Sequence, residues 1–89
     1  MPKMVITHAV SDLEHWLSRK TERADAIESG SGSNVTDHVA TDGSTNVAIS
    51  ADVADVDAMN GMLESPSPEL LAVMQEHGVV PPITTYIEK

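Results

Sequence analysis

Four histidines and one tyrosine are the side chains of this sequence best suited to acid–base or hydrogen-bond chemistry. His8 lies two residues before Val10, where an expected strand gives way to a helix, so both elements would hold its position. Imidazole also changes charge near neutral pH without any perturbation. We therefore assign His8 as the candidate catalytic residue, acting as a general base or a hydrogen-bond donor. The alternative is a structural histidine bonded to a neighbouring backbone group or to Asp12.

His38, Asn46 and Tyr86 are candidate substrate-binding residues because they fall on one predicted face of the sheet. Hydrogen bonds from these side chains would orient a carbonyl or phenol group, with Asn46 the weakest member of the set. The alternative is that they form an ordinary polar interface between two subunits. Trp16 belongs to a set of apolar residues that recur at helical spacing, so the pattern predicts that it packs in the core.

The remaining histidines and the acidic residues form no pattern typical of a metal or cofactor site. His15 is expected to face solvent in the first turn of a helix, and His77 is interpreted as a helix-terminal residue, where a positive charge is favourable. His8, His38 and Asp37 are suitable ligand types, but Asp37 and His38 are adjacent on a strand and point to opposite faces. The sequence also shows no phosphate loop, nucleophile elbow or dinucleotide fingerprint. We expect no metal and no cofactor.

The composition predicts one small domain, residues 1–89, with a formal net charge of −9. With 14 acidic and 5 basic residues, the chain is expected to bind neither nucleic acid nor an anionic membrane. There is no cysteine, and the first residues lack the pattern of a signal peptide, so we expect a cytoplasmic protein. A core this small is marginal by itself, which favours pairing with a second copy as a homodimer.

Apolar periodicity predicts the element order strand, helix, strand, strand, helix, strand. The last helical region is split by Ser65-Pro66-Ser67-Pro68, and Asp52 or Asp55 would cap its first part. This order is that of an α+β, ferredoxin-like βαββαβ domain with a four-stranded antiparallel sheet. The expected strands span residues 3–10, 34–41, 46–51 and 83–88, and the expected helices span residues 11–28, 53–63 and 67–77.

Local signals set several of these boundaries. Ser11 followed by Glu14 is a capping box that would begin the first helix. Residues 29–33, Ser-Gly-Ser-Gly-Ser, are expected to form a flexible loop. Ser67 would cap the last helix and Gly78 would end it.

Alternation along the strands predicts which side chains lie under the helices. The opposite set is small and semi-polar rather than charged, which suits a partner sheet or a lined cavity better than open water. The facing of His8 stays open at this point. The predicted inner set is Val35, Val39, Val47, Ile49, Ala51, Ile83, Thr85 and Ile87.

Residues 5–16, Val-Ile-Thr-His-Ala-Val-Ser-Asp-Leu-Glu-His-Trp, resemble the opening of small dimeric α/β-barrel proteins. Many of those carry His-x-Val-x-Asp-aromatic-x-x-Trp where the first helix starts. The end of the chain is similar too, with Ser-Pro-Glu-Leu at 67–70, Gly-Val-Val-Pro-Pro at 78–82 and Tyr86. The superfamily includes antibiotic biosynthesis monooxygenase-like and muconolactone isomerase-like proteins. This sequence departs from it at Leu13, where an aromatic residue is usual, and in the Gly–Ser loop, where an Arg-containing segment is common.

The resemblance implies that the sheets of two subunits pair as a dimeric α/β barrel. It also implies a cofactor-independent enzyme, of the monooxygenase, isomerase or cyclase kind, that acts on a small organic molecule. His8 would transfer the proton, His38 and Tyr86 would position the substrate, and Trp16 would border the pocket. That pocket would lie between the helices and the sheet or between the paired sheets. The alternative is a non-catalytic dimeric module that binds a small apolar ligand or supports another protein.

Overall fold

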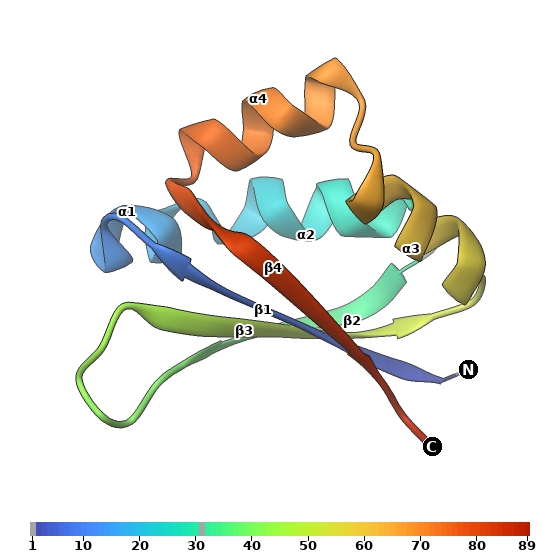
Figure 1. The fold of residues 1–89 in the computed structure, drawn as a ribbon, viewed down its shortest axis with the longest axis horizontal. Coiled ribbons are helices and arrows are strands. Elements are labelled where there is room, and N and C mark those ends of the chain that lie inside the picture. The colour runs from blue at the N-terminus through green and yellow to red at the C-terminus, as the bar shows by residue number, and fades with distance from the viewer. Residues whose placement is uncertain (1, 31) are drawn as a thin grey trace.

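The computed structural model describes residues 2–30 and 32–89. Its strands form one antiparallel sheet in the order β2-β3-β1-β4, and the helices all lie on one face of that sheet (Figure 1). The predicted α+β, ferredoxin-like βαββαβ fold is confirmed, including the split of the last helical region. The elements are β1 (Lys3–Val10), α1 (Leu13–Ser18), α2 (Lys20–Ser29), β2 (Gly32–Val39), β3 (Asn46–Val53), α3 (Val56–Glu64), α4 (Pro68–Glu76) and β4 (Val79–Ile87).

The first helical region is broken into α1 and α2, whereas a single helix over residues 11–28 was predicted. The Ser18 hydroxyl donates to the His15 carbonyl at 2.6 Å. The Arg19 N–H donates to the Trp16 carbonyl at 3.2 Å, three residues back, which is a tighter turn than that of an α-helix. The chain then restarts as α2 directly after Arg19.

Asp12, not Ser11, caps α1. The Asp12 carboxylate accepts a hydrogen bond from the His15 N–H at 3.1 Å. Ser11 instead donates its own N–H to the Gly78 carbonyl at 2.9 Å, so it ties the start of α1 to the end of α4. Gly78 has a φ of +74°, a conformation that glycine adopts without strain, and it ends the last helical region as predicted. Of the two residues predicted as alternatives, Asp52 and Asp55, it is Asp55 that caps α3, and Ser67 caps α4 as predicted.

The connection before β2 is shorter than the predicted five-residue loop. Ser29 ends α2 and Gly32 begins β2, while Ser31 lies outside the described residues. Both ends of the predicted loop are therefore parts of regular elements. None of the helices in residues 2–30 and 32–89 is long and apolar enough to cross a membrane.

β4 begins at Val79, four residues earlier than the predicted start at Ile83. Pro81 and Pro82 therefore lie inside a strand, although proline has no N–H to give to a neighbouring strand. β4 is an edge strand that pairs only with β1 among the described strands, and an edge tolerates proline.

The core lies between the sheet and the helices. Val35 packs against the core as predicted. Val39 and Thr85 were also predicted to be inner residues but are exposed; Val39 is the last residue of the edge strand β2, and Thr85 lies on the edge strand β4. The other inner residues are confirmed: Val47, Ile49 and Ala51 are buried, and Ile83 and Ile87 pack against the core. The buried apolar side chains are those of Met4, Ile6, Val10, Trp16, Ile27, Val47, Ile49, Ala51, Val53 and Met59.

Candidate functional site

His8 points to the helix side of the sheet and is buried, with 8% of its surface exposed. Its ring meets the ring of Trp16 edge-on, with the two centroids 6.3 Å apart. Its Nδ1 lies 2.9 Å from the Ala9 carbonyl oxygen. Because a carbonyl oxygen only accepts, Nδ1 carries the proton and Nε2 presents a lone pair. This backbone contact is the one that a structural histidine would make, yet it leaves the imidazole in the form that a general base needs.

The edge strand β4 bulges next to His8. Thr7 pairs with Thr84 and Ala9 pairs with Val80, so the single residue His8 faces three residues of β4. Bulges frequently redirect side chains next to functional sites. His8 borders two cavities, and it is the one residue in the described part of the chain that lines both.

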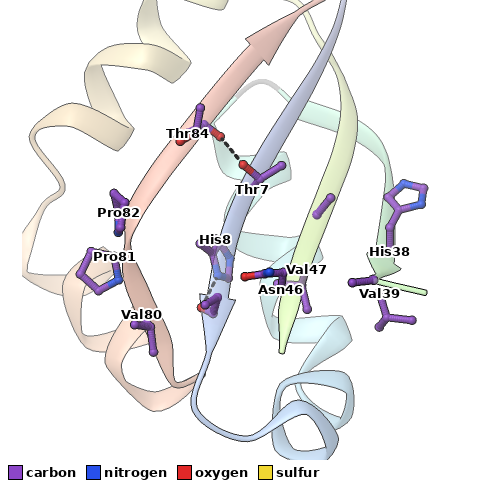
Figure 2. Close-up of a pocket in the computed structure, with 13 residues that line it drawn as sticks. Thr7, His8, His38, Val39, Asn46, Val47, Val80, Pro81, Pro82 and Thr84 are labelled. Atoms are coloured by element: carbon purple, nitrogen blue, oxygen red, sulfur yellow. Dashed lines mark hydrogen bonds between the residues drawn. The ribbon is translucent and has the colours of Figure 1, made fainter. Parts of the chain in front are cut away.

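The larger cavity is an open groove of about 440 Å³ at the sheet face that carries no helix, and we call it the open-face groove. Figure 2 shows Val80, Pro81 and Pro82 along one of its sides and His38 and Val39 along the other. Small side chains from the centre of the sheet form its floor. Its lining residues with hydrogen-bonding side chains are Thr7, His8, His38, Asn46 and Thr84.

The open-face groove brings together two of the predicted substrate-binding residues, His38 and Asn46. His38 is also held on this face by Ser50, whose Oγ lies 2.9 Å from its Nε2. Tyr86 does not line the groove, and 58% of its surface is exposed. Trp16 lines neither cavity, because its side chain is fully buried in the core.

The smaller cavity lies between the helices and the sheet and measures about 70 Å³; we call it the helix-side cavity. His8, Arg23 and His77 are its polar lining residues. An apolar cavity with a few convergent polar groups is the common form of a small-molecule site. The apolar lining comes mainly from two helices and the sheet. α3 and α4 supply Met59, Met62, Leu63, Leu70, Val73 and Met74, and the strands supply Ile6, Ile49, Val79 and Ile83.

Arg23 organises the polar part of the helix-side cavity, and the sequence had not drawn attention to it. Its Nε and Nη2 donate to the Asp37 carboxylate at 3.1 and 2.8 Å. Its Nη1 donates to the Trp16 carbonyl at 2.9 Å. The sequence pattern could have predicted this pair. Arg23 follows Trp16 by two helical turns and so shares its inward face, and Asp37 shares the inner face of β2 with Val35. Opposite charges that both face a core must pair.

Burial and the charge of Arg23 favour the neutral form of both inner histidines. Burial lowers the pKa of His8 below its usual 6.5; the bond to Ala9 opposes this shift and Arg23 reinforces it. His77 is only 3% exposed, and its pKa is lowered by burial and then by Arg23, against nearby carboxylates. His77 does follow the last residue of α4 as predicted, but the expectation of a favourable positive charge is wrong because its ring lies beside a guanidinium.

The helix-side cavity must widen to admit an organic ligand. Its volume of about 70 Å³ is less than half of the roughly 150 Å³ of an engineered cavity that binds benzene. α4 supplies Leu70, Val73 and Met74 to the wall and has no buried residue. It lies above α2, on the side away from the sheet, in Figure 1. α4 is therefore the part of the cavity wall best able to move.

The side chains considered as metal ligands do not converge. Asp37 is bound to Arg23 on the helix side, whereas His38 bonds to Ser50 on the open face, so the two point to opposite faces as predicted. Within residues 2–30 and 32–89, no group of three His, Asp or Glu side chains is placed to hold a metal ion.

Comparison with known proteins identifies the fold. No protein-family model and no curated protein matches the chain. A structure from Bordetella bronchiseptica assigned to the antibiotic biosynthesis monooxygenases superposes with a TM-score of 0.67 and 12% identity over 99% of this chain and 94% of that one. SnoaB from Streptomyces nogalater, a cofactor-independent oxygenase, gives 0.65 and 14% over 99% and 90%. The ActVA-Orf6 monooxygenase of Streptomyces coelicolor, in complex with nanaomycin D, gives 0.61 and 15% over 99% and 85%.

The TM-scores establish a shared fold, and the sequence identities of 12–15% are too low to establish more than that. The resemblance to antibiotic biosynthesis monooxygenase-like proteins, expected from residues 5–16 and from the end of the chain, is confirmed at the level of the fold over essentially the full length. A fold of this kind hosts many functions, so the function must be argued from the site.

Proposed function

We propose that the chain is a homodimeric, cofactor-independent enzyme that removes a proton from a small organic molecule in the helix-side cavity. The observation that carries this proposal is the state of His8. Its Nδ1–H is bound to the Ala9 carbonyl, its Nε2 has no hydrogen-bond partner among the described residues, and its ring lines an apolar cavity. The shared fold of a cofactor-independent oxygenase supports a reaction that needs only side chains and substrates.

Proton removal is the step that the three expected reaction types share. His8 Nε2 would take a proton from a carbon beside a carbonyl group, and the electron pair of that C–H bond would move onto the carbonyl oxygen. An isomerase returns the proton to another carbon, a cyclase lets the carbanion attack a second carbonyl, and a monooxygenase lets it react with O₂. The lowered pKa of His8 supports this role, because the imidazole is unprotonated at neutral pH.

A second copy of the chain would cover the open face of the sheet. No helix covers that face (Figure 1), and two valines beside the open-face groove, Val39 and Val80, are 47% and 41% exposed. Pairing would bury these side chains and close the groove. A ligand bound between the paired sheets, as in the second candidate function, would then contact His38, Asn46 and Tyr86. Trp16 would act on the helix-side cavity from the core by holding Arg23.

The second candidate function is non-catalytic binding of a small apolar ligand in the open-face groove of the dimer. The size of the groove favours it, because about 440 Å³ falls within the range of roughly 300–1,000 Å³ typical of small-molecule sites. In either case we expect a cytoplasmic protein.

Deuterium exchange tests the first proposal without knowledge of the natural substrate. A panel of small ketones in D₂O is followed by NMR with and without the protein, and loss of the C–H signals beside the carbonyl reports proton removal. The wild type should accelerate exchange of at least one ketone. The His8→Ala variant should lose about 100-fold or more of that rate, as expected for one lost acid–base group.

His38→Ala is the matched control, because it removes an imidazole from the open face and leaves the helix-side cavity intact. It should keep the wild-type exchange rate. If His38→Ala abolishes exchange and His8→Ala does not, catalysis belongs to the open-face groove. If the wild type accelerates no ketone but binds apolar ligands in that groove, the second candidate function replaces the first.

A further inference from the structure

The geometry around His77 fixes which of its nitrogens carries the proton. Nη1 of Arg23 lies 3.4 Å from Nδ1 of His77. A guanidinium only donates hydrogen bonds, so Nδ1 must accept, and a proton on Nδ1 would point at a positive charge. The neutral imidazole of His77 therefore carries its proton on Nε2.

His77 and His8 are opposite tautomers beside one cavity. His8 donates from Nδ1 to the Ala9 carbonyl and presents an accepting Nε2, whereas His77 accepts at Nδ1 from Arg23 and presents a donating Nε2–H. Both residues line the helix-side cavity. Neither Nε2 has a hydrogen-bond partner within the described chain, so the hydrogen-bonding capacity of both nitrogens is unused.

We propose that His77 is a second catalytic residue of this cavity, whose Nε2–H donates to the carbonyl oxygen of the substrate while His8 deprotonates the adjacent carbon. Arg23 is the positioning residue that fixes the tautomer of His77. The proposal rests on the proposed function and deepens it, because it specifies a substrate with a C–H bond directly beside a ketone or aldehyde carbonyl.

The chemistry needs such a donor. When His8 removes the proton, negative charge develops on the carbonyl oxygen, and a fixed N–H aimed at that oxygen stabilises it. A neutral imidazole can perform this task, because its N–H donates to the carbonyl oxygen and polarises the carbonyl group. Arg23 is a poorer candidate for direct contact, since Asp37 and the Trp16 carbonyl already accept hydrogen bonds from all three of its nitrogens. No oxidant or reductant takes part in this step.

The tautomers can be read directly from the wild-type chain without ligand. Long-range proton–nitrogen NMR correlations distinguish a protonated from an unprotonated ring nitrogen. At neutral pH, His8 should show its proton on Nδ1 and His77 should show it on Nε2. A proton on Nδ1 of His77, or a doubly protonated His77 ring, would overturn the proposal.

Ligand binding supplies a test that does not depend on turnover. Cyclopentanone and methylenecyclopentane have nearly the same shape, but only the ketone accepts a hydrogen bond. The wild type should bind cyclopentanone about fivefold more tightly, the usual effect of one neutral hydrogen bond, with a shift of the His77 Nε2 resonance. His77→Phe should abolish this preference and His77→Gln, which keeps an N–H donor, should retain part of it. Equal preference in wild type and His77→Phe would contradict the proposal.

Deuterium exchange separates this proposal from the proposed function. His77→Phe should slow ketone exchange by about 100-fold, as for removal of one oxyanion donor. If His8→Ala abolishes exchange and His77→Phe leaves it unchanged, His8 is the base and the role of His77 is wrong. If neither variant changes the exchange rate, the proposed function itself is wrong.

Discussion

The guanidinium carbon of Arg23 lies 3.8 Å from the centre of the Trp16 ring, while Nη2 of the same side chain donates to Asp37 at 2.8 Å. Arg23 thus connects α2 to α1 by stacking and to β2 by an ion pair. His8 meets the same Trp16 ring edge-on, and His77 accepts from Arg23. One buried cation therefore contacts His77 directly and is linked to His8 through Trp16.

We expect the Arg23–Asp37 pair to be essential for stability. Its side chains are only 6% and 3% exposed, so Asp37→Ala leaves a buried positive charge without a partner. The free energy of unfolding, measured with denaturant, should fall by about 3–5 kcal/mol. Asp25→Ala removes a carboxylate from the exposed side of α2 and should change it by about 0.5 kcal/mol or less.

A double variant separates the cost of an unpaired charge from the value of the pair. Arg23→Met combined with Asp37→Leu removes both charges and keeps apolar volume, so it should recover most of the stability lost by Asp37→Ala. An Asp37→Ala variant as stable as Asp25→Ala would show that the pair does not organise the core.

Stability should decrease as the pH falls below about 6.5. The pKa values of His8 and His77 are lowered in the folded chain from their usual 6.5, through burial first and with a contribution from Arg23. The unfolded chain then binds more protons over that range, so acid favours unfolding. The charged groups that act on His77 are Arg23 and Arg19, which lower its pKa, and Glu22 and Glu76, which raise it.

Denaturant unfolding at a series of pH values measures this effect. Three carboxyls with lowered pKa values, those of Glu22, Asp42 and Asp52, act around pH 4 and below, outside this range. Replacing both His8 and His77 by Gln should flatten the dependence between pH 5 and 7. An unchanged slope in the double variant would exclude these histidines as its source.

Enlarging the helix-side cavity should increase its affinity for organic ligands. Met74→Ala removes a partly buried side chain from the α4 wall, so the cavity would approach the volume that accepts a ring-sized molecule. Binding of cyclopentanone, followed by NMR, should become tighter although the protein becomes less stable. Leu71→Ala changes an exposed residue of α4 and is the matched control. Equal affinities in the two variants would show that the cavity wall does not limit entry.

The open sheet face should form the dimer interface. Ala48 lies on that face in register with Thr7 and His38, so Ala48→Glu places a charge in the centre of the proposed contact. Light scattering at micromolar concentration should give a dimer mass for the wild type and a monomer mass for this variant. Thr21→Glu adds the same charge to the exposed side of α2 and should leave the dimer intact. A monomeric wild type would contradict the account of the open face.

The order of the elements could be predicted from the sequence because local signals agree with the fold. Alternating apolar residues mark β1 and β3, and Ser67 followed by Pro68 marks the start of α4. The break at Arg19 could not be predicted, because it depends on side-chain bonds to backbone carbonyls that helix propensity does not report.

The site could be predicted only in part for the same reason. His8 stands out because of its residue type and its place at the end of a strand, but which way it faces depends on packing against Trp16. His77 resembles an ordinary helix-terminal histidine until the fold brings Arg23 beside it, 54 residues away in the sequence. A pairing of that separation leaves no periodic signal.

The pH dependence of ketone deuterium exchange tests the central claim, that His8 is the proton-transfer base, most directly. The rate per unit of free enzyme reports the pKa of the base. With the wild type, it should fall with acid around a midpoint below 6.5, the direction expected from the burial of His8, and His8→Ala should remove this pH-dependent component. A midpoint above 6.5, or the same profile in His8→Ala, would contradict the account.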